Sequence, residues 1–234
     1  VSGFMITSVR FRPVHHNSYM KVYAAIEELG LPLAFHAGYN WNENSMTMMN
    51  KFISVHALGF VWYNMVHLTN WVLNALPERF PKLKVIWIES GLAWLPFMIQ
   101  RLDNEYMMRS SECPGLKKLP GEYITDMFYT TQPMEIPRDM SLLESTFKCI
   151  KADTQLLYSS DYPHWDFDAP DRAIPVRLAP EDNSVRRAKV RQHRQPPSRV
   201  KHKAKDKARE NGKAKDAADV GLHDGFRNPL RLMS

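Results

Sequence analysis

The stretch that decides the fold is residues 84–91, which read Lys-Val-Ile-Trp-Ile-Glu-Ser-Gly. The apolar run is short and rich in β-branched and aromatic side chains, which is typical of a strand buried on both faces of a parallel sheet. It ends in a carboxylate, Glu89, and the serine and glycine that follow predict a turn. The sequence therefore predicts a buried strand with a charged side chain at its carboxyl end.

The same kind of pattern extends in both directions over residues 1–171. Further strand-like runs are predicted at residues 3–9, 31–36, 127–131 and 155–161. Helices are predicted at about residues 18–29, 48–76, 93–109 and 139–150, the first capped by Asn17 or Ser18 and stopped by Gly30. Strands alternating with helices favour an α/β fold with a parallel sheet, either a (β/α)8 barrel or a doubly wound open sheet. No glycine-rich phosphate loop is present, which favours the barrel.

Three of the predicted strands end in side chains that can carry chemistry, namely His36, Glu89 and Asp161. In a (β/α)8 barrel the active site gathers at the carboxyl ends of the strands. Histidine and aspartate are good ligands for zinc or a similar divalent ion, and a catalytic site usually has three protein ligands. Structural roles remain open, since His36 could stabilise a loop, Asp161 could cap a turn and Glu89 could pair with an arginine.

Three motifs in order carry a resemblance to a known family. They are residues 31–38 (LPLAFHAG), residues 80–91 (FPKLKVIWIESG) and residues 158–164 (YSSDYPH). They resemble the fifth-, sixth- and eighth-strand motifs of the amidohydrolase-related family, in the branch that includes aminocarboxymuconate semialdehyde decarboxylase and related aromatic-acid decarboxylases. The resemblance spans essentially residues 1–170.

The resemblance implies a (β/α)8 barrel around one divalent metal, zinc or manganese. It implies that His36 and Asp161 are metal ligands and that Asp161 also handles the proton of the metal-bound water. The position of Glu89 usually holds a histidine in the decarboxylases. A glutamate there could still transfer a proton, but it cannot stabilise an anion as an imidazolium would. The expected function is hydrolysis or non-oxidative decarboxylation of a small, carboxylated, aromatic metabolite.

The sequence also departs from the family pattern at its start. It begins near the family's fourth strand, so the first-strand ligand motif, often His-x-His, is absent, and the barrel is expected to be incomplete, with strands four to eight. The adjacent His15 and His16 are not expected to replace that motif. An incomplete parallel barrel is expected to self-associate or to rely on upstream sequence. The alternative function is a catalytically incomplete remnant that binds an anionic partner through a basic tail.

Other side chains are candidates for the walls of the site. Arg10 and Arg12 could bind a substrate carboxylate in a bidentate fork, and His164 and Trp165 follow Asp161 closely enough to border the substrate. The histidines of the long helical region, His56 and His67, are interpreted as core side chains with satisfied imidazoles rather than as a pocket for an aromatic acid.

Charge and composition divide the 234-residue chain in two. Residues 172–234 hold 17 Lys/Arg against 7 Asp/Glu, whereas residues 1–171 hold 14 against 18. The second segment is interpreted as a disordered basic tail, and the first as the barrel portion. The lack of aromatic side chains between the basic residues argues against nucleic-acid binding. Two cysteines and no long apolar run exclude a disulfide scaffold and a membrane span, and we expect a cytoplasmic protein with a small-molecule substrate that could form a homo-oligomer.

Overall fold

A computed structural model of the chain describes residues 2–8, 12–38 and 43–168. Five parallel strands form one sheet in this part of the chain. The strands are β1 (Phe4–Ser8), β2 (Leu33–Ala37), β3 (Val85–Ile88), β4 (Phe128–Thr130) and β5 (Leu156–Leu157). The helices are α1 (Asn17–Glu28), α2 (Asn44–Thr47), α3 (Phe52–Leu73), α4 (Leu76–Arg79), α5 (Trp94–Arg109), the 3₁₀ turn η1 (Ser110–Glu112), α6 (Pro120–Ile124), α7 (Met140–Cys149) and α8 (Ala152–Gln155).

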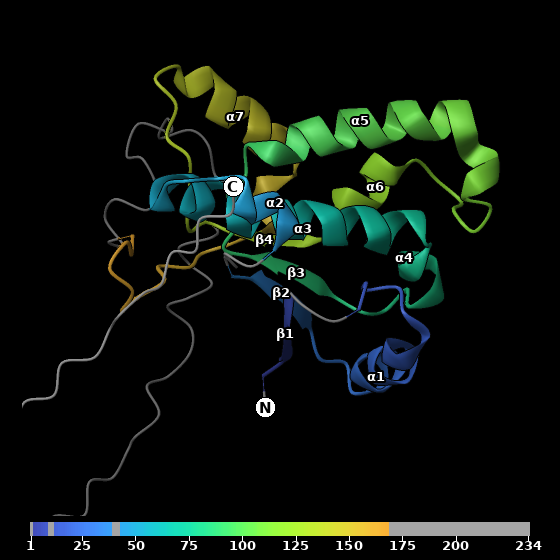
Figure 1. Ribbon diagram of the computed structural model, residues 1–234. Helices are drawn as coiled ribbons and strands as arrows, with labels where there is room; N and C mark the ends of the chain where they lie inside the picture. The colour runs from blue at the N-terminus through green and yellow to red at the C-terminus, as the bar shows by residue number, and fades with distance from the viewer. Residues whose placement is uncertain (1, 9–11, 39–42, 169–234) are drawn as a thin grey trace, which may run out of the picture. The chain divides into compact units, whose positions relative to one another are not determined.

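The strand order is β1-β2-β3-β4-β5, so each strand lies beside the one before it in the chain (Figure 1). Successive right-handed crossovers in one direction place their helices on the same face of the sheet. A doubly wound sheet instead reverses its strand order at a switch point. The observed order is therefore the winding of a (β/α)8 barrel. Among the described residues β1 and β5 each pair on one side only, so the sheet they form is open.

The core forms where one row of strand side chains meets the helices. Phe35, Trp87 and Tyr129 stand in register on β2, β3 and β4. The rings of Phe35 and Trp87 stack with centroids 4.8 Å apart, and Trp71 of α3 packs edge-on to Phe35 at 5.5 Å. Because side chains alternate along a strand, the next residue of β2, His36, belongs to the opposite face of the sheet.

The structure corrects two details at the ends of predicted elements. Helix α1 is capped by His16, whose Nδ1 accepts a hydrogen bond from the Ser18 amide at 3.1 Å, and not by Asn17 or Ser18. Gly30 has a φ of +65°, as its predicted role as a left-handed stop requires.

The last predicted strand, residues 155–161, is also too long, because β5 ends at Leu157. Beyond that point the Thr131 side chain replaces the backbone ladder, since its Oγ1 accepts from the Ser159 amide at 2.9 Å and donates to the Ser159 carbonyl at 3.0 Å. Asp161 therefore lies in a loop anchored to β4 rather than at the end of a strand.

Two of the sequence predictions fall on residues that the structure does not describe. Arg10 and the basic tail at residues 172–234 lie outside the described ranges, and the division of the chain at residue 171 stays a prediction. Within the described ranges, no helix combines the length and the apolar character needed to cross a bilayer.

Candidate active site

The carboxylate at the end of β3 is held in a strained, buried position. Glu89 follows directly after β3, is 8% exposed and has a φ of +56°. Left-handed backbone costs a non-glycine residue about 1–2 kcal/mol, so the surroundings must hold it. The Glu89 amide donates to Thr130 Oγ1 at 3.2 Å, and the buried Asn64 of α3 donates from Nδ2 to the Ile88 carbonyl at 3.0 Å. Strain that persists in this way points to a functional position.

His36 of β2 is bonded directly to Glu89. His36 Nε2 lies 2.6 Å from Glu89 Oε2, and both side chains are largely shielded from solvent. The hydrogen bond to Glu89 raises the pKa of His36 against the opposing effect of burial, and the charges of Glu89 and Asp161 add to the increase. The pair therefore fixes the orientation of both the imidazole and the carboxylate.

Asp161 is held by a tight loop turn that also places His164. Asp161 has a φ of +60°, its carbonyl accepts from the His164 amide at 2.9 Å, and its Oδ2 lies 2.9 Å from His164 Nδ1. Burial, and then the nearby charge of Glu89, raise the pKa of the Asp161 carboxyl, although His164 opposes this effect. The turn thus presents a carboxylate and an imidazole side by side.

Glu89, Asp161 and His164 bring three ligand atoms together. One atom from each lies within 4.8 Å of the other two. We call these three residues the acidic cluster. Two carboxylate oxygens and one imidazole nitrogen suit zinc or manganese, and the strained backbone of Glu89 and Asp161 serves to direct both carboxylates to one point. The donor set therefore fits the divalent metal that the sequence predicted. His36 lies outside this trio and adjoins it through Glu89.

An aromatic wall borders the acidic cluster on the side of α3. It consists of Phe52, His56 and Phe60 from α3 and Trp165 from the loop after β5. The Phe60 ring lies 6.3 Å from the His36 ring, and the His56 ring lies 5.4 Å from both the Phe60 and Trp165 rings. His56 Nε2 also lies 3.5 Å from Asp166 Oδ2. The interpretation of His56 as a core side chain is therefore wrong, because the amino half of α3 faces the site.

The remaining predicted side chains have other positions. Arg12 donates to Ser18 Oγ at 3.0 Å on an exposed surface. Trp165 is 77% exposed, although its ring lies against His56. The His67 ring stacks on Phe35 of the core, but the prediction of a satisfied imidazole is wrong, because both ring nitrogens are buried without a hydrogen-bond partner among the described residues.

Among the side chains around the site that sequence reasoning missed, three are acidic. Asp166 and Asp168 stand in the same short segment as His164 and could have been found from that spacing. Burial, together with the charges of Asp166 and Asp161, raises the pKa of Asp168. Glu135 accepts from the amides of Leu92 and Ala93, at 2.8 and 3.3 Å, at the amino end of α5, and no sequence signal indicates that contact.

Comparison with known proteins identifies a matching family and solved structures with a similar fold. A family model described as amidohydrolase matches residues 6–204. Among solved structures, 5-carboxyvanillate decarboxylase from Sphingomonas paucimobilis superposes with a TM-score of 0.60 at 21% identity, over 80% of this chain and 55% of that one. An amidohydrolase from Mycobacterium avium subsp. paratuberculosis K-10 gives 0.54 at 20% identity, over 67% and 39%.

A third solved structure holds both a metal and an inhibitor. Dihydroxybenzoic acid decarboxylase from Polaromonas sp. JS666, with bound manganese and 2-nitroresorcinol, gives a TM-score of 0.52 at 21% identity, over 71% of this chain and 48% of that chain. The chain thus spans about half the length of the solved structures it matches. At identities this low, the comparisons show only that the fold is shared. The shared fold confirms the predicted α/β barrel class.

Proposed function

The chain belongs to the amidohydrolase family, and we propose that it acts as a metal-dependent decarboxylase of small aromatic carboxylic acids. The observation that carries the proposal is the acidic cluster beside an aromatic wall, at the carboxyl ends of parallel strands. Two of the solved structures that share the fold are decarboxylases of carboxylated aromatic rings. The substrate class follows from that likeness and from the aromatic wall.

Glu89, Asp161 and His164 would hold the metal, and His36 would support it by fixing the Glu89 carboxylate. When bound, a divalent ion would supply positive charge to polarise an oxygen of the substrate. An aromatic ring fits against His56, Phe60 and Trp165, because aromatic rings pack favourably edge-to-face or offset. These residues would orient the substrate so that its carboxylate-bearing carbon faces the Asp161 side chain.

Decarboxylation breaks one carbon–carbon bond and requires one proton. The bonding electron pair stays on the ring carbon as carbon dioxide leaves, and that carbon must then be protonated. Asp161 Oδ2 and His164 Nδ1 lie 2.9 Å apart and can share a proton. A proton on His164 Nδ1 is compatible with metal binding through the other ring nitrogen, and we assign Asp161 Oδ2 as the atom that passes this proton to the ring carbon.

Hydrolysis is the second candidate function, and the environment of Glu89 favours it. A buried carboxylate fixed by a 2.6 Å hydrogen bond to His36 is suited to accepting a proton from an attacking water. A histidine at that position would instead favour stabilising an anion. The two reactions use the same residues. Decarboxylation releases carbon dioxide and takes up a proton, whereas hydrolysis consumes water.

One experiment separates these two functions. The purified chain, with manganese or zinc added, is incubated with 2,6-dihydroxybenzoate and 5-carboxyvanillate, and in parallel with the amide and ester of benzoic acid. The proposal expects carbon dioxide and the matching phenol, with activity abolished by a chelator and restored by metal. Cleavage of only the amide or ester would replace decarboxylation by hydrolysis, and no turnover of any of them would count against both.

We also propose that the chain self-associates along the outer side of β1. Phe4 and Met5 of β1 are 40% and 58% exposed, and strand edges with exposed apolar side chains tend to recruit other chains. Sedimentation velocity should show a dimer or larger species, and Met5→Lys should shift it toward the monomer. A stable monomer at micromolar concentration would contradict this.

A further inference from the structure

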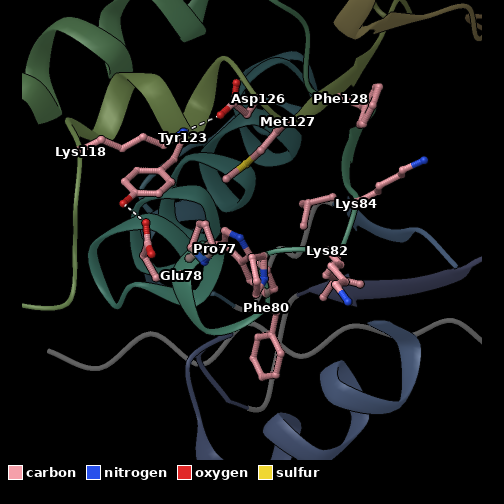
Figure 2. Close-up of a pocket in the computed structure, with 14 residues that line it drawn as sticks. Pro77, Glu78, Phe80, Lys82, Lys84, Lys118, Tyr123, Asp126, Met127 and Phe128 are labelled. Atoms are coloured by element: carbon pink, nitrogen blue, oxygen red, sulfur yellow. Dashed lines mark hydrogen bonds and ion pairs between the residues drawn. The ribbon is translucent and has the colours of Figure 1, made fainter. Parts of the chain in front are cut away.

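A cavity of about 550 Å³ lies at the edge of the sheet opposite the acidic cluster (Figure 2). Its lining includes Val85 and Phe128, the first residues of β3 and β4. Glu89 follows the last residue of β3, so at 3.3 Å per residue the strand separates the cavity from the acidic cluster by about 13 Å. The proposed decarboxylation makes no use of this edge.

The floor of the cavity is apolar. It is formed by Trp71 from the end of α3, by Phe80 and Leu83 from the loop before β3, and by Met127 from the loop before β4. All four side chains are at most 8% exposed, so they hold their positions as part of the core. An apolar ligand group placed against the surface that these side chains leave open would lose contact with water.

The acidic side chains on the rim are already neutralised. Glu78 accepts from Lys117 Nζ at 2.7 Å and from the Tyr123 hydroxyl at 2.5 Å. Asp126 lies 2.5 Å from Lys118 Nζ and 3.5 Å from Lys151 Nζ. These pairs, two of which Figure 2 shows, leave neither carboxylate free to repel an anion.

Two further lysines on the rim have no such partner. Within the described ranges, no acidic side chain lies within ion-pair distance of the ammonium group of Lys82 or Lys84. Both flank Leu83 of the floor, and both are exposed. The rim therefore carries an excess of positive charge next to a buried apolar surface.

We propose that this cavity binds a small organic anion with an apolar body, of the class of hydrophobic carboxylates. The apolar body rests on Trp71, Phe80 and Met127, and the carboxylate faces Lys82 and Lys84. The volume lies within the range of cavities that hold small molecules, and the lining combines apolar side chains with charged ones. The site is separate from the acidic cluster and does not depend on the proposed activity.

The test uses 1-naphthoate as the probe and isothermal titration calorimetry as the measurement. The metal-free chain is expected to bind one naphthoate, and the double variant K82Q/K84Q is expected to bind it about tenfold more weakly, since each exposed charge contact contributes up to about fivefold in affinity. The uncharged 1-naphthalenemethanol should bind both proteins alike. The control K21Q/K148Q removes two exposed lysines from α1 and α7 and should leave naphthoate binding unchanged.

Binding of naphthoate to the Asp161→Asn variant shows at which of the two edges of the sheet the probe binds. The proposal expects the affinity of that variant to equal that of the unaltered chain. It is overturned if naphthoate does not bind, if K82Q/K84Q behaves like K21Q/K148Q, or if Asp161→Asn abolishes binding, which would assign the probe to the acidic cluster. Melting temperatures of all variants confirm that each is folded.

Discussion

The carboxyl and amino edges of the sheet carry opposite charge, although the same strands form both. At the carboxyl edge, the carboxylates of Glu89 and Asp161 converge, and each is hydrogen-bonded to an imidazole. At the amino edge, each rim carboxylate of the cavity pairs with a lysine, and Lys82 and Lys84 remain without acidic partners among the described residues. The first arrangement suits a metal cation and the second an organic anion.

The two edges also differ in how firmly they are built. At the carboxyl edge, the strained backbone at Glu89 is held by two buried side chains. Asn64 donates to the Ile88 carbonyl, and Thr130 Oγ1 accepts from the Glu89 amide. The ion pairs of the amino edge join side chains that are exposed or partly exposed. Convergent like charges need such support, because they repel one another until a cation binds, whereas surface pairs form at little cost. Three predictions test that difference, and a fourth tests the core between the two edges.

The largest effect is expected from Asp161→Asn. Asparagine keeps the size of the side chain and removes both its charge and its ability to carry the proton. If the proposed activity is present, turnover should fall at least about 10²-fold, with the melting temperature nearly unchanged. The matched variant at the other edge, Asp126→Asn, should keep full turnover. Normal turnover in Asp161→Asn with metal still bound would show that Asp161 has only a structural role.

Asn64→Leu should lower the free energy of unfolding by about 1–3 kcal/mol. The substitution leaves the buried Ile88 carbonyl without the donor that it has in the folded chain. Asn70→Leu lies on the same helix, and the Asn70 side chain donates to the Val66 carbonyl of its own turn. This substitution should change that free energy by less than about 0.5 kcal/mol. Equal effects in urea unfolding would show that α3 does not brace the carboxyl edge.

His67 should make the stability of the core depend on pH. Burial lowers the pKa of His67 to about 4, against about 6.5 in an unfolded chain. The unfolded state therefore takes up a proton that the folded state does not. The stability that the neutral His67 gives the folded state is lost as the pH falls from 6.5 toward 4.

When the pH falls from 7 to 5, this single imidazole should lower the free energy of unfolding by about 2 kcal/mol. Urea unfolding of His67→Phe should show a pH dependence smaller by that amount. An unchanged dependence would mean that the imidazole is hydrated in the folded state.

The smallest effect is expected at the amino edge. Lys118→Gln removes the ion pair with Asp126, which joins two solvent-accessible side chains. Its loss should cost no more than about 1 kcal/mol in unfolding free energy and should shrink further in high salt. A loss comparable to that of Asn64→Leu would erase the contrast between the two edges.

The strand-end residues could be predicted because a short apolar run that stops at a charge is a local pattern. Glu89 and His36 are adjacent to, or within, strands that such runs define, and the loop motif identified Asp161. His56 could not be assigned in this way, because α3 is apolar on most of its surface, and Leu58 and Trp62 are exposed. Only tertiary packing decides which face of that helix meets the site.

The amino-edge cavity lay beyond prediction for a different reason. Lysines are ordinary surface residues, and nothing in the local sequence distinguishes Lys82 and Lys84 from Lys117 or Lys118. Which of them lack an acidic partner depends on contacts between segments that are distant in the chain, such as Glu78 with Lys117 and Tyr123.

The central claim is that Glu89, Asp161 and His164 form one divalent metal site. Titration of the metal-free chain with Mn²⁺, with free Mn²⁺ followed by its electron paramagnetic resonance signal, tests it without reference to activity. We expect one Mn²⁺ per chain, binding at least about tenfold weaker in Glu89→Gln, Asp161→Asn and His164→Gln, and unchanged binding in Asp126→Asn. Absence of stoichiometric uptake, or equal uptake by Asp161→Asn and the unaltered chain, would contradict the account.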